Sequence, residues 1–384
     1  MCLPSCPTYQ ITKNENESPR GRIALMQGVV QGELTLTSKI KDHLDHCVSC
    51  LSCENICPST VQYETLIDGI REYTVSKQQY TTTAKLISFF ITPIFQKSVF
   101  TLLRLYQLGG LQTIVRKIGL LKVIGLHSQE KLLPKLSPYL KLKEHYPSTS
   151  TSIGTVAFFT GCMGNLFEQK AILASIQVLN TLGYDVDVPS QVCCGALHQH
   201  SGYSEQAERL AVQNKKSFLD ANSYVAIIFS ASGCGTQLKS TLKQSEIPVT
   251  SIMQFVYNHV QSCSLKFMAI ETKNIAVHQP CSLKNSLGED SAVIRLLNKI
   301  PSLTVTELSS QCCGAAGKNM LTQTNLANQI RQPLLEQIIA NSPDIVVSSN
   351  IGCALHLMAG LSDEHKKEIP LIHPVELLAQ SLIS

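Results

Sequence analysis

The second half of the chain alternates short apolar runs with longer amphipathic segments. Four runs rich in β-branched and aromatic residues each lead into a cysteine: TVAFFTGC, YVAIIFSASGC, NIAVHQPC and DIVVSSNIGC. Such runs are typical of buried strands that end in a loop. Other segments, such as KAILASIQVLNTLG, have apolar residues at helical spacing. Strands that alternate with helices predict two α/β units with parallel sheets, whose ligand sites lie at the carboxyl ends of the strands.

The first half of the chain has the pattern of helices. In ESPRGRIALMQGVVQGEL, Ser18 can cap a helix, Pro19 suits its first turn, and apolar residues follow at helical spacing. Arg20 and Arg22 fall in the first turn, where positive charge does not favour the helix dipole. These two charges are therefore either solvated or placed beside an anionic group.

The middle of the chain combines dense apolar residues with an excess of positive charge. Between residues 81 and 145 only Glu130 and Glu144 oppose ten basic residues, and Pro93 and Gly109 with Gly110 break the helical pattern. Basic amphipathic helices either pack on neighbouring domains or lie on an anionic membrane surface, and both interpretations stay open. The basic residues are Lys85, Lys97, Arg104, Arg116, Lys117, Lys122, Lys131, Lys135, Lys141 and Lys143.

Composition narrows the class of protein. The chain has 384 residues, of which 44% are hydrophobic and 16% are charged, enough for about two or three folded domains. The net charge of +4 makes no case for nucleic-acid binding. The sequence shows no secretory signal and no apolar run long enough for a membrane span. We expect a cytoplasmic protein with reduced cysteines, and the basic middle segment leaves open peripheral binding at the inner face of the membrane.

Four of the 15 cysteines form an iron–sulfur motif. The stretch CVSCLSCENICPS places Cys47, Cys50, Cys53 and Cys57 at C-x2-C-x2-C-x3-C-P spacing. In two-cluster ferredoxins the first three cysteines ligate one cluster and the fourth ligates the other. Four-thiolate zinc sites usually consist of two separated C-x2-C pairs. The spacing therefore favours a [4Fe–4S] cluster over zinc.

The first ten residues, MCLPSCPTYQ, match the end of a second such motif. Cys2 and Cys6 correspond to its third and fourth cysteines, and we expect the reading frame to begin upstream of Met1 and to supply the missing two. Roughly 40 residues separate the two motifs, which predicts a helical ferredoxin with a helix pair between its cluster loops. Crossed ligation leaves Cys2 and Cys57 as an incomplete set. It also gives one complete set, which is Cys6, Cys47, Cys50 and Cys53.

Eight further cysteines form two quartets with identical spacing. Successive members are 31, 1 and 40 residues apart in both quartets, and each member of the second follows its counterpart by 119 residues. Such repetition indicates a duplicated domain. The remaining cysteine, Cys263, stands alone and is expected to be an ordinary residue. The quartets are Cys162, Cys193, Cys194 and Cys234, and Cys281, Cys312, Cys313 and Cys353.

Each quartet is a candidate metal site. Adjacent cysteines can face one centre only from a loop or a helix start, and the glycine that follows each pair, Gly195 or Gly314, permits that turn. Four thiolates suit an iron–sulfur cluster or zinc, and adjacent thiols also suit thiol–disulfide chemistry, so three alternatives stay open. His198, His200 and His278 lie near these cysteines, either as structural residues or as residues that ligate or tune the centre.

Taken together, these motifs resemble the iron–sulfur subunit of glycolate oxidase (glycolate dehydrogenase). The resemblance rests on the twin ferredoxin motif with ESPRGRI between its halves and on the two Cys-Cys-Gly domains. It also rests on ASGCG at 231–235 and NIGCALHL at 350–357, and it covers essentially the whole chain. The Cys-Cys-Gly domains alone are similar to those of heterodisulfide reductase, of the membrane-anchoring subunit of anaerobic glycerol-3-phosphate dehydrogenase, and of lactate-utilisation proteins.

The resemblance implies an electron-transfer subunit of an oxidoreductase. Flavin-containing partner subunits would oxidise glycolate or D-lactate, and electrons would pass through the iron–sulfur clusters of this chain towards membrane quinone. The alternatives are the iron–sulfur subunit of a glycerol-3-phosphate or D-lactate dehydrogenase, and a heterodisulfide-reductase-like enzyme. Each quartet lacks one cysteine of the heterodisulfide-type C-x2-C, which argues against disulfide reduction. The chain also lacks the G-x-G-x-x-G fingerprint of a flavin or nicotinamide site.

The expected fold class is a helical twin-cluster ferredoxin domain followed by two duplicated α/β Cys-Cys-Gly domains. We expect the ferredoxin-like domain at 1–75, a basic helical connector at 76–150, and the Cys-Cys-Gly domains at 151–265 and 266–384. The polar, turn-rich stretch 144–154 is expected to be a linker.

Overall fold

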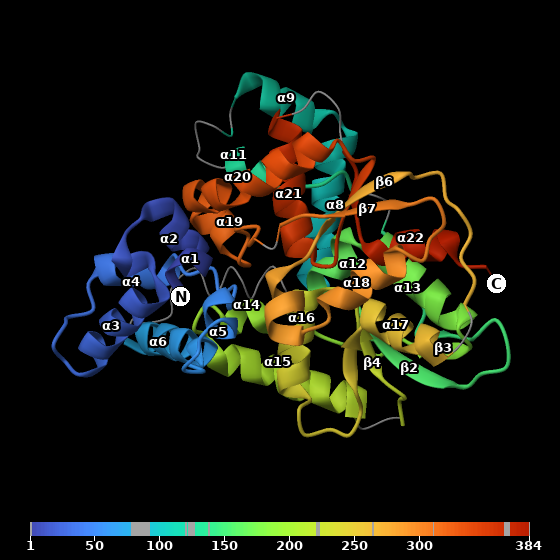
Figure 1. The fold of residues 1–384 in the computed structure, drawn as a ribbon, viewed down its shortest axis with the longest axis horizontal. Coiled ribbons are helices and arrows are strands. Elements are labelled where there is room, and N and C mark those ends of the chain that lie inside the picture. The colour runs from blue at the N-terminus through green and yellow to red at the C-terminus, as the bar shows by residue number, and fades with distance from the viewer. Residues whose placement is uncertain are drawn as a thin grey trace.

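The fold is seen in a computed structural model, and it has the predicted class (Figure 1). A helical N-terminal region leads through a helical connector to two α/β units, each with its own sheet. Cys263 and the apolar stretch before Pro93 lie outside the residues that the structure describes. Those residues are 2–77, 93–119, 121, 127–136, 139–219, 223–262, 265–309, 311–364 and 369–383.

The N-terminal region is built from short helices around a small apolar core. The helix predicted after Ser18 is confirmed, because the Gly21 N–H donates to Ser18 Oγ at 3.0 Å at the start of α3. Two helices, α3 and α4, separate the cysteine loops as expected, and Met26 and Leu44 bury their side chains between them and α6. The elements are α1 (Cys2–Ser5), α2 (Pro7–Thr12), η1 (Glu15–Glu17), α3 (Pro19–Val30), α4 (Ser38–Asp45), α5 (Ser52–Asn55) and α6 (Tyr63–Lys77).

The connector contains two helices that meet at the predicted glycine break. Gly109 with Gly110 separates α8 from α9, so this predicted interruption is confirmed. The predicted interruption at Pro93 depends on residues 78–92, which lie outside the described residues. No helix in the part of the chain that the structure describes is both long and apolar enough to cross a membrane. The elements are α8 (Pro93–Leu108), α9 (Leu111–Ile118) and α11 (His127–Lys131).

The first α/β unit has a five-stranded sheet in the order β1-β3-β2-β4-β5. Its strands are parallel except β1, which pairs antiparallel with β3 through His145 and Tyr146. The expected linker is therefore partly wrong, because His145 and Tyr146 add an edge strand to this sheet. The strands are β1 (His145–Tyr146), β2 (Gly154–Phe159), β3 (Tyr184–Asp187), β4 (Ile227–Phe229) and β5 (Val249–Ser251). The helices are α12 (Cys162–Phe167), α13 (Gln169–Thr181), α14 (Ala196–Gln199), α15 (Ser204–Leu219), α16 (Ser232–Thr241) and α17 (Ile252–Ser262).

The second α/β unit repeats this arrangement with four parallel strands in the order β7-β6-β8-β9. The four apolar runs that predicted strands form β2, β4, β6 and β8, so those predictions are confirmed. The strands are β6 (Asn274–His278), β7 (Thr304–Glu307), β8 (Ile345–Ser348) and β9 (Leu371–Ile372). The helices are η2 (Ser282–Leu287), α18 (Asp290–Leu297), α19 (Asn319–Thr322), α20 (Thr324–Asn341), α21 (Ile351–Glu364) and α22 (Pro374–Ser381).

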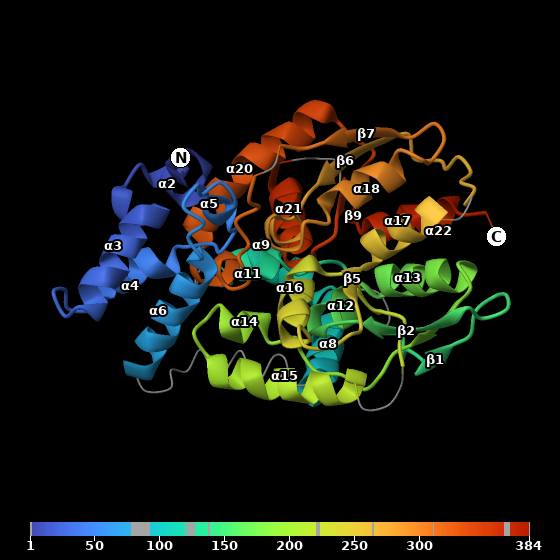
Figure 2. The ribbon, with the colours of Figure 1, turned by 60° about the horizontal axis from the view of Figure 1, so that its bottom comes forward.

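Helices from both units pack together between the two sheets. Figure 2 shows α13, α17, α18 and α22 in this layer. Helix α22 of the second unit packs on α13 of the first, and α17 of the first packs on α18 of the second. The buried side chains of Leu179, Val256, Leu296 and Leu377 belong to one continuous apolar core. The two units therefore share a core, which fixes their cysteine loops relative to one another.

Candidate metal centres

Four cysteines of the N-terminal region surround one cavity. Cys6, Cys47, Cys50 and Cys53 line a small cavity together with Arg22 and other residues. These four thiols are the complete set expected from crossed ligation. Cys2 and Cys57 do not line this cavity. The structure therefore brings together the cysteines of the complete set and leaves the incomplete set outside.

The two arginines of the ESPRGRI stretch have different surroundings. Arg20 is exposed and pairs with Glu15 at 2.5 Å. Arg22 is 1% exposed, and its Nη1 lies 4.0 Å from Cys6 Sγ. Burial opposes its charge, but Cys47 and the other neighbouring acidic groups raise the pKa of its guanidinium above the ordinary value. Arg22 thus places a permanent positive charge beside the cavity, whereas Arg20 is solvated.

A buried carboxylate holds Arg22 in place. Arg22 Nη2 donates to Glu17 Oε2 at 2.7 Å, and the other carboxylate oxygen lies 2.5 Å from His43 Nδ1 and 2.8 Å from His46 Nδ1. Burial raises the pKa of Glu17, but the hydrogen bonds from His46 and His43 and the charge of Arg22 hold it below its ordinary value. Nothing in the cysteine spacing predicted Glu17, His43 and His46, because they are not part of the metal-binding motif.

The electrostatics of the cavity suit an iron–sulfur cluster. Burial raises the pKa of the Cys6 and Cys53 thiols, yet thiols bind iron only as thiolates. Arg22 offsets part of the resulting negative charge, and the Tyr63 hydroxyl donates to Cys47 Sγ at 3.7 Å. Four converging thiolates are a complete protein ligand set for a [4Fe–4S] cluster. The residues present therefore fit this group.

The first quartet lies at the carboxyl ends of the strands of the first sheet. Cys162 follows β2, the Cys193-Cys194 pair follows β3, and Cys234 lies in α16 after β4. Cys162 Sγ is 3.5 Å from Cys193 Sγ, and Cys194 makes hydrogen bonds with both Cys193 and Cys234. The four thiols therefore form one connected group. Gly195, with φ of 90°, makes the turn that the sequence predicted after the pair.

The second quartet has the same arrangement in the second sheet. Cys313 Sγ lies 2.8 Å from Cys353 Sγ, and Cys312 makes hydrogen bonds with Cys281 and Cys313. Gly314 has φ of 79°, and a Cβ at this position would lie 2.5 Å from the carbonyl oxygen of Ala327 in α20. The residue after the pair must therefore be glycine for two reasons, backbone conformation and lack of space.

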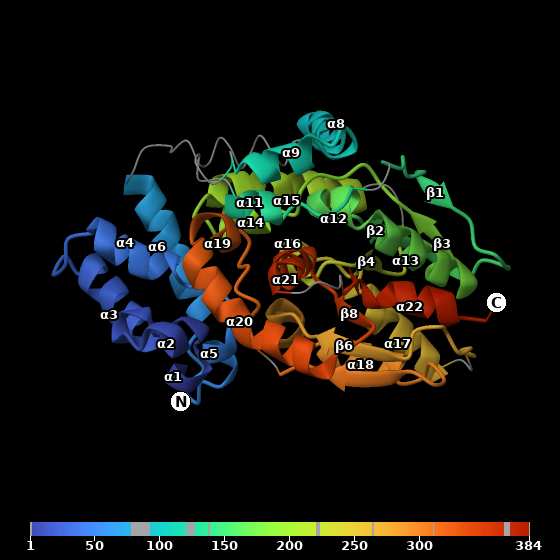
Figure 3. The ribbon, with the colours of Figure 1, turned by 90° about the horizontal axis from the view of Figure 1, so that it is seen from above.

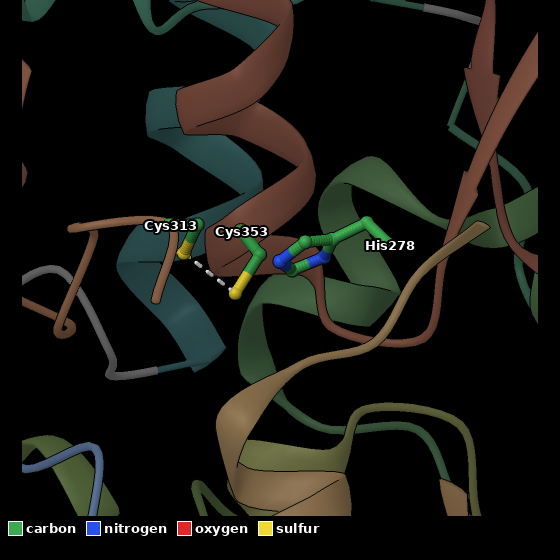
Figure 4. Close-up of side chains that lie close together, drawn as sticks. All are labelled: His278, Cys313 and Cys353. Carbon is green, nitrogen blue, oxygen red and sulfur yellow. Dashed lines mark hydrogen bonds between the residues drawn. The ribbon is translucent and has the colours of Figure 1, made fainter. Parts of the chain in front are cut away.

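The three histidines near the quartets have different environments. His278 is buried, and one of its ring nitrogens lies within 4.8 Å of the Cys313 and Cys353 sulfurs (Figure 4). His198 is buried close to Cys193, and burial lowers its pKa. His200 instead contacts Asp68 of the N-terminal region, with 3.4 Å between Nδ1 and Oδ1. The structural interpretation suits His200, whereas His198 and His278 lie at the centres.

One cysteine of the N-terminal cavity contacts the second quartet. The Cys50 thiol makes a hydrogen bond with the Cys312 thiol, and this bond lowers the pKa of Cys50 to about 6. Val48 and Ile330 pack beside this pair of cysteines in one apolar cluster. Figure 3 shows the N-terminal helices beside α20 of the second unit. The first cysteine site and the second quartet are therefore in direct contact.

Asn285 joins the two regions at this contact. Its Nδ2 donates to the Cys50 carbonyl oxygen at 2.6 Å and to Ser52 Oγ at 3.1 Å, and Asn55 Nδ2 donates to its Oδ1 at 3.0 Å. Asn285 lies in the π-helix η2, which directly follows Cys281. Local irregularities of this kind are frequent at functional sites. No sequence pattern pointed to Asn285, because Cys50 lies 235 residues away along the chain.

Comparisons with known proteins agree with this architecture. A protein-family model for a 4Fe-4S dicluster domain matches residues 1–61, and a model for a cysteine-rich domain matches residues 156–239 and 275–358. The first match supports [4Fe–4S] clusters in the N-terminal region. The fold is similar to that of a hypothetical protein from Helicobacter pylori, with a TM-score of 0.56 and 12% identity over 98% of this chain and 70% of that one.

Relatives align along the whole chain. A Bacillus subtilis protein named "Probable glycolate oxidase iron-sulfur subunit" is 31% identical over 99% of this chain and 92% of its own length. The "Glycolate oxidase iron-sulfur subunit" of Escherichia coli is 28% identical over 100% of this chain and 92% of its own length. "Lactate utilization protein A" of Macrococcus caseolyticus is 24% identical over 58% of this chain and 95% of its own. The full-length similarity and the two domain types show that the chain belongs to the family of glycolate oxidase iron–sulfur subunits.

Proposed function

We propose that this chain relays electrons from a flavin-containing partner subunit, which oxidises a 2-hydroxy acid such as glycolate, to quinone at the membrane surface. The observation that carries the proposal is the thiol–thiol contact between Cys50 of the N-terminal cavity and Cys312 of the second quartet. Oxidation of the hydroxy acid to the 2-oxo acid releases two electrons and two protons, and reduction of quinone to quinol consumes the same number. The names of the full-length relatives support the identity of the substrate.

The proposal assigns a ligand role to each group of cysteines. Cys6, Cys47, Cys50 and Cys53 would hold a [4Fe–4S] cluster, which accepts and donates one electron at a time. Cys2 and Cys57 would belong to a second cluster of the same type. Each quartet would hold a further iron–sulfur centre, since its thiols are connected and lie at the carboxyl ends of parallel strands.

Contact between two cysteine sites suits a relay for a physical reason. Electron tunnelling through protein becomes steeply slower as the separation of the two centres grows. Cys50 and Cys312 belong to different sites but share a hydrogen bond, so little protein separates the two centres. Asn285 holds the Cys50 loop against the second unit by three hydrogen bonds. This residue therefore controls the distance across which the electron passes.

Replacing Asn285 by Ala tests the relay without removing a ligand. We expect iron and acid-labile sulfide contents to stay unchanged, while electron transfer from the reduced flavoprotein partner to quinone becomes several-fold slower. Rapid-mixing spectroscopy of the full complex measures each step. Asn298→Ala is the matched control, because the Asn298 side chain is exposed at the end of α18 and donates to the Ile294 carbonyl oxygen of that helix, away from Cys50. Quinone reduction that proceeds equally fast with the flavoprotein alone would contradict the relay.

The helices of the connector support binding to an anionic membrane surface. Six aliphatic side chains on α8 and α9 are between 50% and 69% exposed, and the surrounding segment 81–145 carries ten basic residues against two acidic ones. The two helices lie on one side of the molecule (Figure 3). Such a surface matches the apolar and anionic layers of a membrane interface. The exposed residues are Leu102, Leu105, Leu108, Leu111, Ile114 and Ile118.

Flotation with liposomes measures this binding. The complete chain is expected to float with vesicles that contain anionic lipid and to stay behind with neutral ones. Replacing both Leu105 and Leu108 by Gln removes two apolar contacts and is expected to weaken binding by about tenfold. Val212→Gln is the matched control, because Val212 is 55% exposed on α15, a helix of the first α/β unit rather than of the connector. Equal flotation of all three proteins would exclude α8 as the membrane contact.

A further inference from the structure

The two quartets differ at one position next to the cysteines. His278 follows Phe159 by 119 residues, the offset that relates Cys281 to Cys162. Both residues end the central strand of their sheet, three positions before the first cysteine of the quartet. The second unit therefore has an imidazole where the first unit has a phenyl ring.

The imidazole of His278 points into the second quartet. Figure 4 shows it facing Cys313 and Cys353, and one ring nitrogen lies within 4.8 Å of both sulfurs. The side chain is 2% exposed. Its Nε2 is buried and has no hydrogen-bond partner among the residues that the structure describes. A buried ring nitrogen without a hydrogen-bond partner destabilises the folded protein, unless a bound ligand takes the place of that partner.

The other ring nitrogen of His278 has a partner that is also specific to the second unit. His278 Nδ1 lies 3.0 Å from Ser348 Oγ on the neighbouring strand. In the first sheet the equivalent cross-strand pair is Phe159 with Phe229. An apolar pair in one unit thus corresponds to a hydrogen-bonded histidine–serine pair in the other. Histidine ligands of metals commonly donate their second ring N–H in this way, which orients the ring.

The residue after the last cysteine follows the same exchange. Gly235 has no room for a Cβ, because the Phe229 ring occupies that space. The equivalent residue in the second unit is Ala354, and the small Ser348 replaces the phenylalanine there. The second unit therefore lacks the two phenyl rings that lie beside the first quartet. In their place, the polar side chain of His278 faces the thiols.

We propose that Nε2 of His278 is an iron ligand at the second quartet, in addition to the thiolates of Cys281, Cys312, Cys313 and Cys353. The proposal rests on the iron–sulfur centre assigned to this quartet under the proposed function. In this arrangement Nδ1–H donates to Ser348 Oγ and leaves the Nε2 lone pair directed at the metal. The first quartet has Phe159 at the equivalent position, and a phenyl ring cannot bind iron in this way, so the two duplicated centres differ at this position.

A mixed ligand set changes the reduction potential. The reduction potential of an iron–sulfur cluster depends on its protein ligands, and the second centre would have a neutral fifth ligand that the first lacks at the equivalent position. The two duplicated centres are therefore expected to differ in potential. This is also the centre that Cys50 contacts. The difference gives electrons a preferred direction between the duplicated sites.

The direct test uses the unaltered protein. The full chain is produced with ¹⁵N-labelled histidine, purified anaerobically and poised at potentials that make the second centre paramagnetic. Pulsed EPR is expected to detect a directly coordinated histidine nitrogen. Its hyperfine coupling to the cluster should differ between protein with ¹⁴N-histidine and protein with ¹⁵N-histidine. A cluster signal without any strongly coupled histidine nitrogen would overturn the proposal. Zinc in place of iron at this quartet would overturn it as well.

Variants identify the histidine. His278→Phe copies the first unit, and His278→Cys supplies a thiolate; both are expected to lose the nitrogen coupling. His278→Cys exchanges a neutral ligand for a thiolate and should also lower the potential of the second centre. His278→Cys should retain iron and sulfide, so it remains informative if His278→Phe fails to fold. His356→Gln is the control, because His356 is also buried with both ring nitrogens unpartnered in the described part of the chain. Coupling that persists in His278→Cys, or that is lost only in His356→Gln, would contradict the assignment.

A wrong ligand role for His278 and a wrong electron relay would give different experimental results. Iron and sulfide contents of Cys312→Ser, compared with those of the unaltered chain, show whether the second quartet holds a cluster at all. If the cluster is present and the nitrogen coupling is absent, only the role of His278 is wrong. If the quartet holds no iron, the relay through Cys50 and Cys312 is wrong, and the ligand role of His278 is wrong with it.

Discussion

Replacing Cys53 by Ala is expected to remove one complete cluster, about four iron and four sulfide ions per chain, from the anaerobically purified protein. Cys53 lines the N-terminal cavity with Cys6, Cys47 and Cys50, so its loss leaves three thiolates for a cluster that needs four protein ligands. The corresponding EPR signal of the reduced protein should vanish, and electron transfer to quinone should fall to the background rate. Chemical analysis of iron and sulfide provides the first measurement, and EPR provides the second.

Cys57→Ala is the matched control for this experiment. Cys57 belongs to the same motif but lies outside the cavity, so its removal should leave the cluster of the cavity and its EPR signal unchanged. Loss of this signal in both variants would mean that the cavity does not define the ligand set. Stoichiometric zinc without sulfide in the unaltered chain would exclude an iron–sulfur protein altogether and leave a structural thiolate site.

Replacing Gly21 by Ala is expected to destabilise the N-terminal region by about 2 kcal/mol or more. A Cβ at this position would overlap the carbonyl oxygen of Glu15 in η1, so either η1 or α3 must move. Since η1 carries Glu17, its movement would displace the carboxylate that holds Arg22 beside Cys6. The free energy of unfolding in urea should fall, and the chain should also retain less iron.

Gly69→Ala separates this effect from the general effect of a methyl group in a helix. Gly69 is an exposed position of α6, and nothing lies within 4 Å of the space where its Cβ would be. Alanine favours helix over glycine by roughly 0.5–1 kcal/mol, so this variant should be slightly more stable than the unaltered protein. If Gly21→Ala behaves in the same way, the close approach of η1 to α3 is not a constraint on this region.

The sequence predicted the parts of the structure that depend on local patterns. Apolar runs that end in cysteine located the strands β2, β4, β6 and β8, because a buried strand needs only its own residues to be recognised. The offset of 119 residues revealed the duplication before any sheet was seen. Cysteine spacing also selected the four thiols that line the N-terminal cavity. The expected domain boundaries, such as 1–75 for the first domain, and the ligand roles of the cysteines stay predictions.

Features that depend on distant parts of the chain could not be predicted in this way. The contact of Cys50 with Cys312 and the bonds of Asn285 join segments that are more than 200 residues apart, and spacing carries no information about them. Cysteine spacing also carried no information about Glu17, which contacts Arg22 of α3 and both His43 and His46 at the end of α4. For Arg22 the sequence left two alternatives, and only the packing of α3 decided between them.

The shared core of the two α/β units also has a consequence for folding during synthesis on the ribosome. Helix α22 covers α13, although nearly 200 residues of chain lie between them. Since synthesis proceeds from the N-terminus, the first unit emerges with the apolar side of α13 still uncovered. That unit completes its core only after residues 374–381 have left the exit tunnel. The two α/β units therefore complete their folding together. Their cysteine loops reach their final positions only after the second unit has been synthesised.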